Sequence, residues 1–149
     1  MVGVFLCHHF IGGDCYKPKS AQAGKIVNSC QGSTMDHAQI IKTTQHWLEN
    51  AVIGLNLCPF AKAVFVKNQI RYVVSDAKHL DGFLDDLDRE LDFLAQTPAD
   101  EVDTTLLIHP TVFPDFEIFN DVQAVADDIV AEHDLEGILQ VASFHPDFQ

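Results

Sequence analysis

Two histidines stand in nearly the same setting, each after an apolar run and before a proline. The strings are "LIHPTVFPDF" at residues 107–116 and "SFHPDFQ" at residues 143–149, which contain His109 and His145. Proline disfavours the helical conformation in the residue before it, so each histidine is expected to continue its strand and project from the end. The pattern therefore predicts two imidazoles at strand exits, although a histidine and a proline together are also common where a chain merely turns.

Further polar side chains follow or end apolar runs of the same kind. Ser75 and Asp76 come directly after "IRYVV", and Ser143 lies near the end of the last run. If these strands are parallel, their exits share one edge of the sheet, which is where open α/β folds bind ligands. We therefore expect imidazoles, hydroxyls and a carboxylate at one edge.

A third chemical group is the thiol of Cys58, in "GLNLCPFAKAVF". Pro59 suits the first position of a short helix, which would make Cys58 its N-cap. The positive end of a helix dipole favours the reactive thiolate, so this placement predicts a nucleophile. The alternative is a buried, inert thiol between Leu57 and Phe60, as free cysteines often are.

Three helices are predicted from apolar residues at helical spacing and from their capping signals. The first begins at Asp36 with Gln39 in the capping pattern, the second begins at Asp76 and stops before Pro98, and the third begins at Pro114 or Asp115. Their apolar faces are Ile40, Thr44, Trp47, Leu48, Ala51 and Leu55 in the first, Leu80, Phe83, Leu84, Leu87, Leu91 and Leu94 in the second, and Phe119, Val122, Ala126 and Ile129 in the third.

Strands are predicted at residues 70–74, 104–108 and 138–144, with a helix between each pair. Strand, helix and strand in alternation is typical of parallel sheets with right-handed crossovers. The predicted fold is therefore α/β: a small, mostly parallel, three-stranded sheet (β-α-β-α-β) with the N-terminal helix packed on it. A ferredoxin-like antiparallel sheet is the main rival, but it would need a hairpin that the sequence lacks.

The overall charge narrows the range of partners. The chain has 149 residues and a net charge of -13, which repels phosphate backbones and argues against nucleic acid. The longest uncharged apolar stretch, "MVGVFLCHHFIGG", is far shorter than the ~20 residues of a membrane span. The four cysteines show no metal or redox spacing, so a cytoplasmic protein is expected. A small-molecule substrate fits this composition, and the sequence points to no particular protein partner.

Residues 1–34 differ from the rest of the chain. They hold Lys17, Lys19 and Lys25 against Asp14, three of the four cysteines and no helical or strand period. We expect a weakly ordered or non-native extension, with Met35 as the biological start and residues 35–149 as one α/β domain. A native extension that carries a disulfide is the alternative.

Three longer strings, "WLENAVIGLNLCPFAKAV", "DEVDTTLLIHP" and "DLEGILQVASFHPDFQ", carry a resemblance to a known family. From Asp36 to Gln149 the chain resembles the bacterial domain-of-unknown-function family 1415. The resemblance implies a small cytosolic protein and supplies no activity. It leaves residues 1–34 unmatched, and it implies that the domain is incomplete at its C-terminus, because family members continue beyond the last string.

Three functions fit these residues. In the first, an enzyme, Cys58 is the nucleophile, His109 or His145 is its base, and Asp76, Asp115 or Asp147 orients the imidazole. In the second, Cys58, His109 and His145 bind a zinc or copper ion. In the third, the protein is a non-catalytic acidic interaction module, whose second helix attracts a basic partner. The enzyme is the preferred hypothesis.

Overall fold

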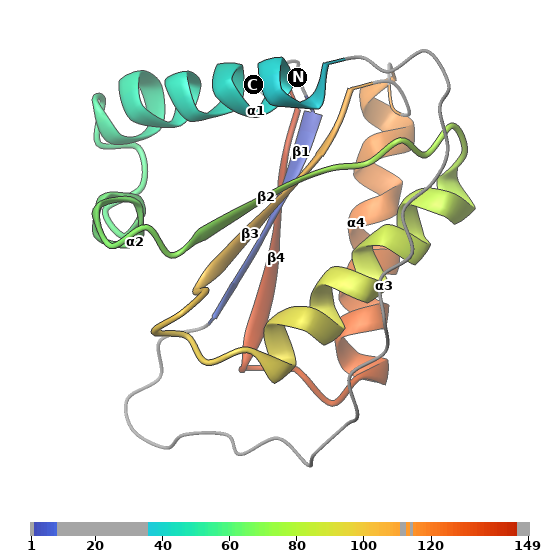
Figure 1. Ribbon diagram of the computed structural model, residues 1–149. Helices are drawn as coiled ribbons and strands as arrows, with labels where there is room; N and C mark the ends of the chain where they lie inside the picture. Colours follow the sequence, from blue (N-terminus) through green and yellow to red (C-terminus); the bar gives the residue numbers. More distant parts are fainter. Residues whose placement is uncertain (1, 9–35, 111–112, 114, 146–149) are drawn as a thin grey trace.

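The computed structural model describes residues 2–8, 36–110, 113 and 115–145. Their elements, in chain order, are β1 (Val2–His8), α1 (His37–Trp47), η1 (Leu48–Ile53), α2 (Ala61–Val66), β2 (Ile70–Val74), α3 (Leu80–Gln96), β3 (Thr104–His109), α4 (Phe116–Glu132) and β4 (Leu139–Phe144). Figure 1 shows α3 and α4 side by side against one face of the sheet, while α1 and α2 lie away from them.

The sheet has four strands in the order β2-β3-β1-β4. β2 pairs with β3 in parallel, whereas β1 is antiparallel to both β3 and β4. The mixed α/β class is confirmed, and β2, β3 and β4 run in the same direction. The predicted three-stranded, mostly parallel sheet is only partly right, because β3 and β4 are separated by a strand and only β2 and β3 form a parallel pair.

The separating strand, β1, was not expected from the sequence. Its residues, "VGVFLCH", form pairs with β3 on one side and with β4 on the other. No alternation of polar and apolar residues marks this segment in the sequence. Residues 9–35 lie outside the described residues, and the predicted domain start at Met35 stays a prediction.

The first helical segment begins as predicted, since the Asp36 carboxylate accepts a hydrogen bond from the Ala38 N–H at 3.2 Å. It then changes into the π-helical segment η1, whose turns contain more residues than α-helical ones. Leu48 and Val52 of this segment are buried, whereas the predicted Leu55 lies beyond the end of the helix and is 70% exposed. The helix ends at Gly54, where a Cβ atom would lie 2.3 Å from the Asn50 carbonyl oxygen.

The other two helices confirm most of the predicted apolar faces, although Leu80 of α3 is 39% exposed. In α3, Phe83, Leu87, Leu91 and Leu94 are fully buried. In α4 the buried residues are Phe119, Val122, Ala126 and Val130. One capping prediction was wrong: α3 begins after His79 and has no side-chain cap, because the Asp76 carboxylate binds His37 instead, at 2.8 Å.

Alternate residues of β3 divide the apolar interior into two clusters, as expected for a strand with both faces covered. Leu107 packs with α3, α4 and Val141 of β4 in the larger cluster. Leu106 packs with Leu48, Val52 and Ala61 in the smaller one, on the opposite face. A side chain at the end of β3 therefore belongs to one cluster or the other according to its place in this alternation.

Candidate functional site

The carboxyl ends of β2, β3 and β4 lie at one edge of the sheet, as the parallel directions require. The Ser75 N–H continues the β2–β3 ladder by donating to the Ile108 carbonyl at 2.8 Å, beside His109. On the other side of β3, His109 is in register with Val2, and Gly3 is in register with Phe144, which precedes His145. The prediction that Ser75, His109 and His145 share one edge is therefore confirmed by the register.

His109 is fully buried on the face that α3 and α4 cover. Its ring makes edge-to-face contacts with Phe83 and Phe113, each at 4.7 Å between centroids, and lies 5.8 Å from Phe119. Among the described residues, neither ring nitrogen has a hydrogen-bond partner. Three aromatic rings of this part of the chain surround the imidazole, and none of them pairs with its nitrogens.

These surroundings keep the His109 ring uncharged. Burial, and then the nearby His145, lowers the pKa of His109 from 6.5 to about 4. At neutral pH one ring nitrogen therefore carries a hydrogen and the other a lone pair, so the ring is one donor and one acceptor. A base with so low a pKa is poorly matched to proton abstraction at neutral pH, and it suits hydrogen bonding or metal ligation better.

His145 lies next to this group at the end of β4 and is also buried. Its ring is 5.3 Å from Phe119 and 5.4 Å from Phe116 between centroids. Its Nε2 donates to the carbonyl oxygen of Phe113 at 3.2 Å. Phe119 therefore contacts both imidazoles, which places the two histidines in one aromatic cluster.

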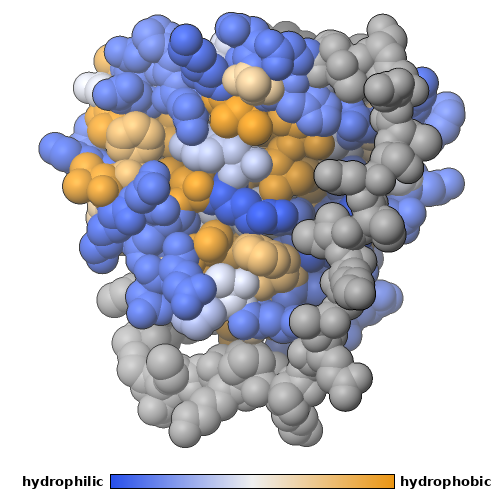
Figure 2. Space-filling model, viewed as in Figure 1, coloured by the Kyte–Doolittle hydropathy of each residue, from blue (hydrophilic) through white to orange (hydrophobic). Residues whose placement is uncertain are grey.

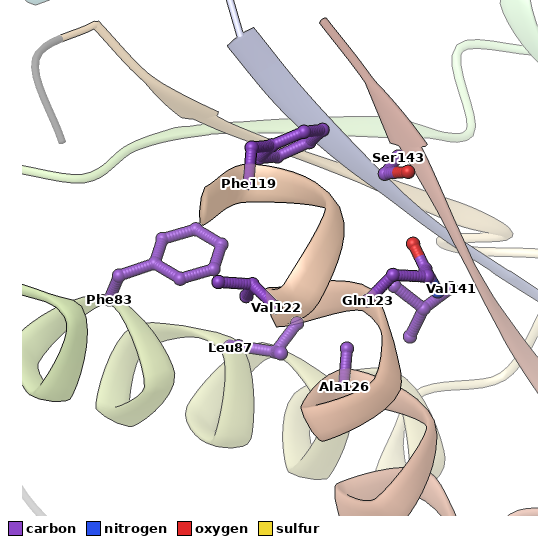
Figure 3. A pocket seen from close by; sticks show the side chains of 8 residues that line it. All are labelled: Phe83, Leu87, Phe119, Val122, Gln123, Ala126, Val141 and Ser143. Carbon is purple, nitrogen blue, oxygen red and sulfur yellow. The ribbon is translucent and has the colours of Figure 1, made fainter. Parts of the chain in front are cut away.

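A narrow hollow reaches this cluster between α3, α4 and β4. Its lining is Phe83, Leu87, Phe119, Val122, Gln123, Ala126, Val141 and Ser143, as Figure 3 shows. Its volume is about 10 Å³, the space that one water molecule needs. Of the predicted hydroxyls, Ser143 is therefore the one that borders the hollow.

The other predicted hydroxyl, that of Ser75, already has hydrogen-bond partners in the local structure. It donates to the Asp86 carboxylate at 2.5 Å and accepts from the Ala77 N–H at 3.2 Å. Asp86 in turn accepts a hydrogen bond from Arg89. These bonds tie the exit of β2 to the first turns of α3, which fixes Phe83 against His109.

None of the predicted orienting carboxylates contacts either histidine within the described structure. Asp76 is exposed and binds His37. Asp115 caps α4, accepting hydrogen bonds from the backbone N–H groups of Glu117 and Ile118. Asp147 lies outside the described residues. Among the described residues, imidazoles and phenyl rings form the site.

Cys58 lies elsewhere. It packs against the smaller cluster around Leu48 and Leu106, on the sheet face opposite His109. Its predicted capping role was wrong, because α2 begins at Ala61 with Phe60 as its N-cap. The structure therefore brings His109 and His145 together and leaves Cys58 apart from them. Across the described residues, no three histidine, cysteine or acidic side chains gather in a way that could hold a metal ion.

The sequence profile described as "Protein of unknown function (DUF1415)" matches residues 39–149. The matched segment is most of the chain and includes His109 and His145. The chain belongs to this family. No match was found among curated proteins or solved structures.

The feature of this DUF1415 chain that the sequence analysis missed is the aromatic box. It consists of Phe83, Phe113, Phe116 and Phe119, the last three within ten residues of His109. The signal was present in "HPTVFPDFEIF", where phenylalanines follow the histidine at short intervals.

Within the part of the chain that the structure describes, no helix is both long and apolar enough to cross a membrane.

Proposed function

We propose that the chain is a histidine-based enzyme whose site lies at the carboxyl edge of the sheet, around His109 and His145. The observation that carries the proposal is the fully buried His109 ring, whose two nitrogens have no hydrogen-bond partner among the described residues. An unpaired buried polar atom costs about 1–3 kcal/mol, and a bound group that pairs with it removes that cost.

The chemistry of the ring limits the substrate. An uncharged imidazole among phenyl rings offers one N–H donor and one lone pair, which suits an uncharged polar group such as a carbonyl or amide. When it donates to a carbonyl oxygen, it stabilises the negative charge that develops there during a reaction. We therefore assign substrate binding and polarisation to His109.

We assign proton transfer to His145, the second imidazole of the cluster. Histidine is the side chain that enzymes use most often for this step. Its contact with Phe119, which also contacts His109, keeps it beside the bound group. Cys58 has no role in this revised site, since it lies on the opposite face of the sheet.

The test is to incubate the purified chain with a mixture of cellular metabolites and follow their consumption by mass spectrometry. His109→Leu is expected to reduce the turnover of the consumed metabolite by about 10²-fold or more. The matched control is His79→Ala, because His79 is exposed and makes no side-chain cap. Unchanged turnover in His109→Leu, or no metabolite consumed by the unmodified chain, would contradict the proposal.

A second candidate is a metal site on the same two imidazoles, without Cys58. The unpaired nitrogens of His109 favour it, because a metal ion binds the unprotonated imidazole nitrogen. Zinc and copper are the ions that such ligands suit best. Elemental analysis of protein purified without a histidine tag would show zinc or copper that His109→Leu and His145→Leu both remove. Equal metal content in all three proteins would reject this candidate.

A further inference from the structure

Four large apolar side chains protrude around α2 and the loop before it. Leu55, Leu57, Phe60 and Val66 are 70%, 67%, 74% and 74% exposed, respectively. Figure 2 shows this hydrophobic surface at the left of the view. Lys62 and Lys67 are exposed on the same helix and at its end. We call these six residues the α2 patch. Exposed apolar side chains gathered in one place, with charged neighbours, are typical of interaction surfaces.

The charges of the chain are divided between its two halves. Residues 36–75 contain four basic and two acidic side chains, whereas 19 of the 22 acidic residues fall in residues 76–149. The α2 patch belongs to the first half, and α3 and α4 belong to the second. Contact between the basic side of one chain and the acidic side of another would therefore pair opposite charges.

The exposed side of α4 has the complementary chemistry. Ile118 and Val125 are 57% and 38% exposed, and they lie two helical turns apart. Exposed acidic residues continue the same stripe at helical spacing. We call this surface the α4 stripe; its members are Ile118, Asp121, Val125, Asp128 and Glu132. It alternates apolar anchors with carboxylates, as the α2 patch combines apolar anchors with lysines.

We propose that the α2 patch of one chain docks on the α4 stripe of a second copy. The apolar side chains of both surfaces would be buried in the centre, with Lys62 and Lys67 against the carboxylates of Asp121 and Asp128 at the rim. Two α2 patches meeting each other would bring four lysines together, which opposes a symmetric contact. An anionic lipid surface would repel a chain whose net charge is -13.

The contact is heterologous, because the two surfaces belong to different parts of the chain. In Figure 1, α2 and α4 lie on opposite sides of the sheet, so both surfaces of a chain remain accessible when one is occupied. Such contacts continue from chain to chain, into a ring if the rotation closes and an open assembly if it does not. At physiological ionic strength the Debye length is about 8 Å, so the net repulsion between copies is screened more than the rim pairs.

Sedimentation velocity over micromolar to millimolar concentrations tests this contact. We expect the unmodified chain to associate reversibly. Lys62→Glu with Lys67→Glu, or Asp121→Lys with Asp128→Lys, is expected to weaken association by at least about tenfold, a loss of about 1.4 kcal/mol. The matched control reverses Lys42 and Lys78, which are exposed and lie outside both surfaces.

The decisive measurement is an equimolar mixture of the two charge-reversed proteins. In the lysine-reversed protein both surfaces are acidic, and in the aspartate-reversed protein both are basic, so neither protein associates with itself. In the mixture, the acidic surfaces of one protein can bind the basic surfaces of the other, so association is expected to return. A monomeric unmodified chain, or a mixture that stays monomeric, would overturn the proposal. So would association that neither charge reversal weakens, which would mean a contact outside both surfaces, or binding of the monomer to anionic vesicles through the α2 patch.

Discussion

Replacing His109 with leucine is expected to raise the free energy of unfolding by about 1–3 kcal/mol at neutral pH. The ring is fully buried, and both of its nitrogens lack partners in the described structure. Leucine has a similar volume and no polar atoms, so it removes this cost while still filling the space between the phenyl rings. Urea unfolding followed by circular dichroism measures the change. A substitution that stabilises the fold and abolishes turnover is expected where a site has been kept for function.

The stabilisation of the fold by His109→Leu is expected to grow as the pH falls. The pKa of His109 is about 4 in the folded chain and 6.5 without its surroundings, so between these values the unfolded chain binds a proton that the folded chain does not. The unmodified chain therefore loses stability as the pH falls from 6.5 towards 4. At pH 4.5 the loss due to this one group is roughly 2–3 kcal/mol.

The comparison that isolates His109 is the difference between the unmodified chain and His109→Leu at each pH. Groups that do not interact with His109 titrate alike in both proteins and cancel in this difference, which leaves the titration of His109 together with its interaction with His145. His79→Leu, at an exposed position, serves as the control and is expected to show little pH-dependent difference. If His109→Leu were less stable than the unmodified chain at every pH, the ring would have partners, and the proposed site would lose its main support.

The elements around this site were largely readable in the sequence. The leucines of α3 follow the helical period, and all four of its fully buried residues lay on the predicted face. Asp115 was expected at the start of α4 and caps it. These features were predictable because each depends on local chemistry: side-chain periodicity in one case, and one carboxylate beside free backbone N–H groups in the other.

Features that depend on contacts between distant segments were not readable. β1 enters between β3 and β4, and no local pattern indicates such an insertion. The helix ends at Gly54, so Leu55 lies outside it and is exposed, and Cys58 packs near Leu48 on the far side of the sheet. The predicted thiol–imidazole pair required Cys58 and a histidine on the same face of the sheet, which the sequence could not determine.

The site itself was half predictable. The strand exits of His109 and His145 followed from two similar strings and from parallel directions, and the register confirms that they share an edge. The surroundings of His109 did not follow, because they depend on how α3 and α4 pack. Phe83 comes from a helix that begins 29 residues before His109, and it contributes to a burial that lowers the pKa of that ring.

The second large effect is expected at the ion pair that joins β2 to α3. Arg71 binds Glu90 through two hydrogen bonds, from Nε at 2.8 Å and from Nη2 at 3.2 Å, and its guanidinium lies 4.2 Å from the centre of the Phe93 ring. The Glu90 side chain is only 9% exposed, while that of Arg71 is 40% exposed. The Glu90 carboxylate is therefore the buried member of the ion pair, and the Arg71 guanidinium compensates its negative charge.

Arg71→Met is expected to lower the free energy of unfolding by about 2–4 kcal/mol, because it leaves a buried carboxylate without its partner. The lower end of that range applies if water reaches the carboxylate through the space that the half-exposed guanidinium leaves. Methionine keeps an unbranched apolar stem against Phe93, so lost packing contributes little. Thermal unfolding at neutral pH measures the effect, which corresponds to a fall in Tm of roughly 2–4 °C per kcal/mol for a chain of this size.

The double substitution Arg71→Met with Glu90→Leu distinguishes an unpaired charge from damage to the fold. Replacing both members of a buried pair with apolar side chains is often nearly neutral, so the double variant is expected to recover most of the lost stability. The coupling energy from the double-mutant cycle should then exceed about 1 kcal/mol. If the double variant were as unstable as Arg71→Met, packing rather than charge would hold β2 against α3, and the placement of Phe83 beside His109 would depend on apolar contacts alone.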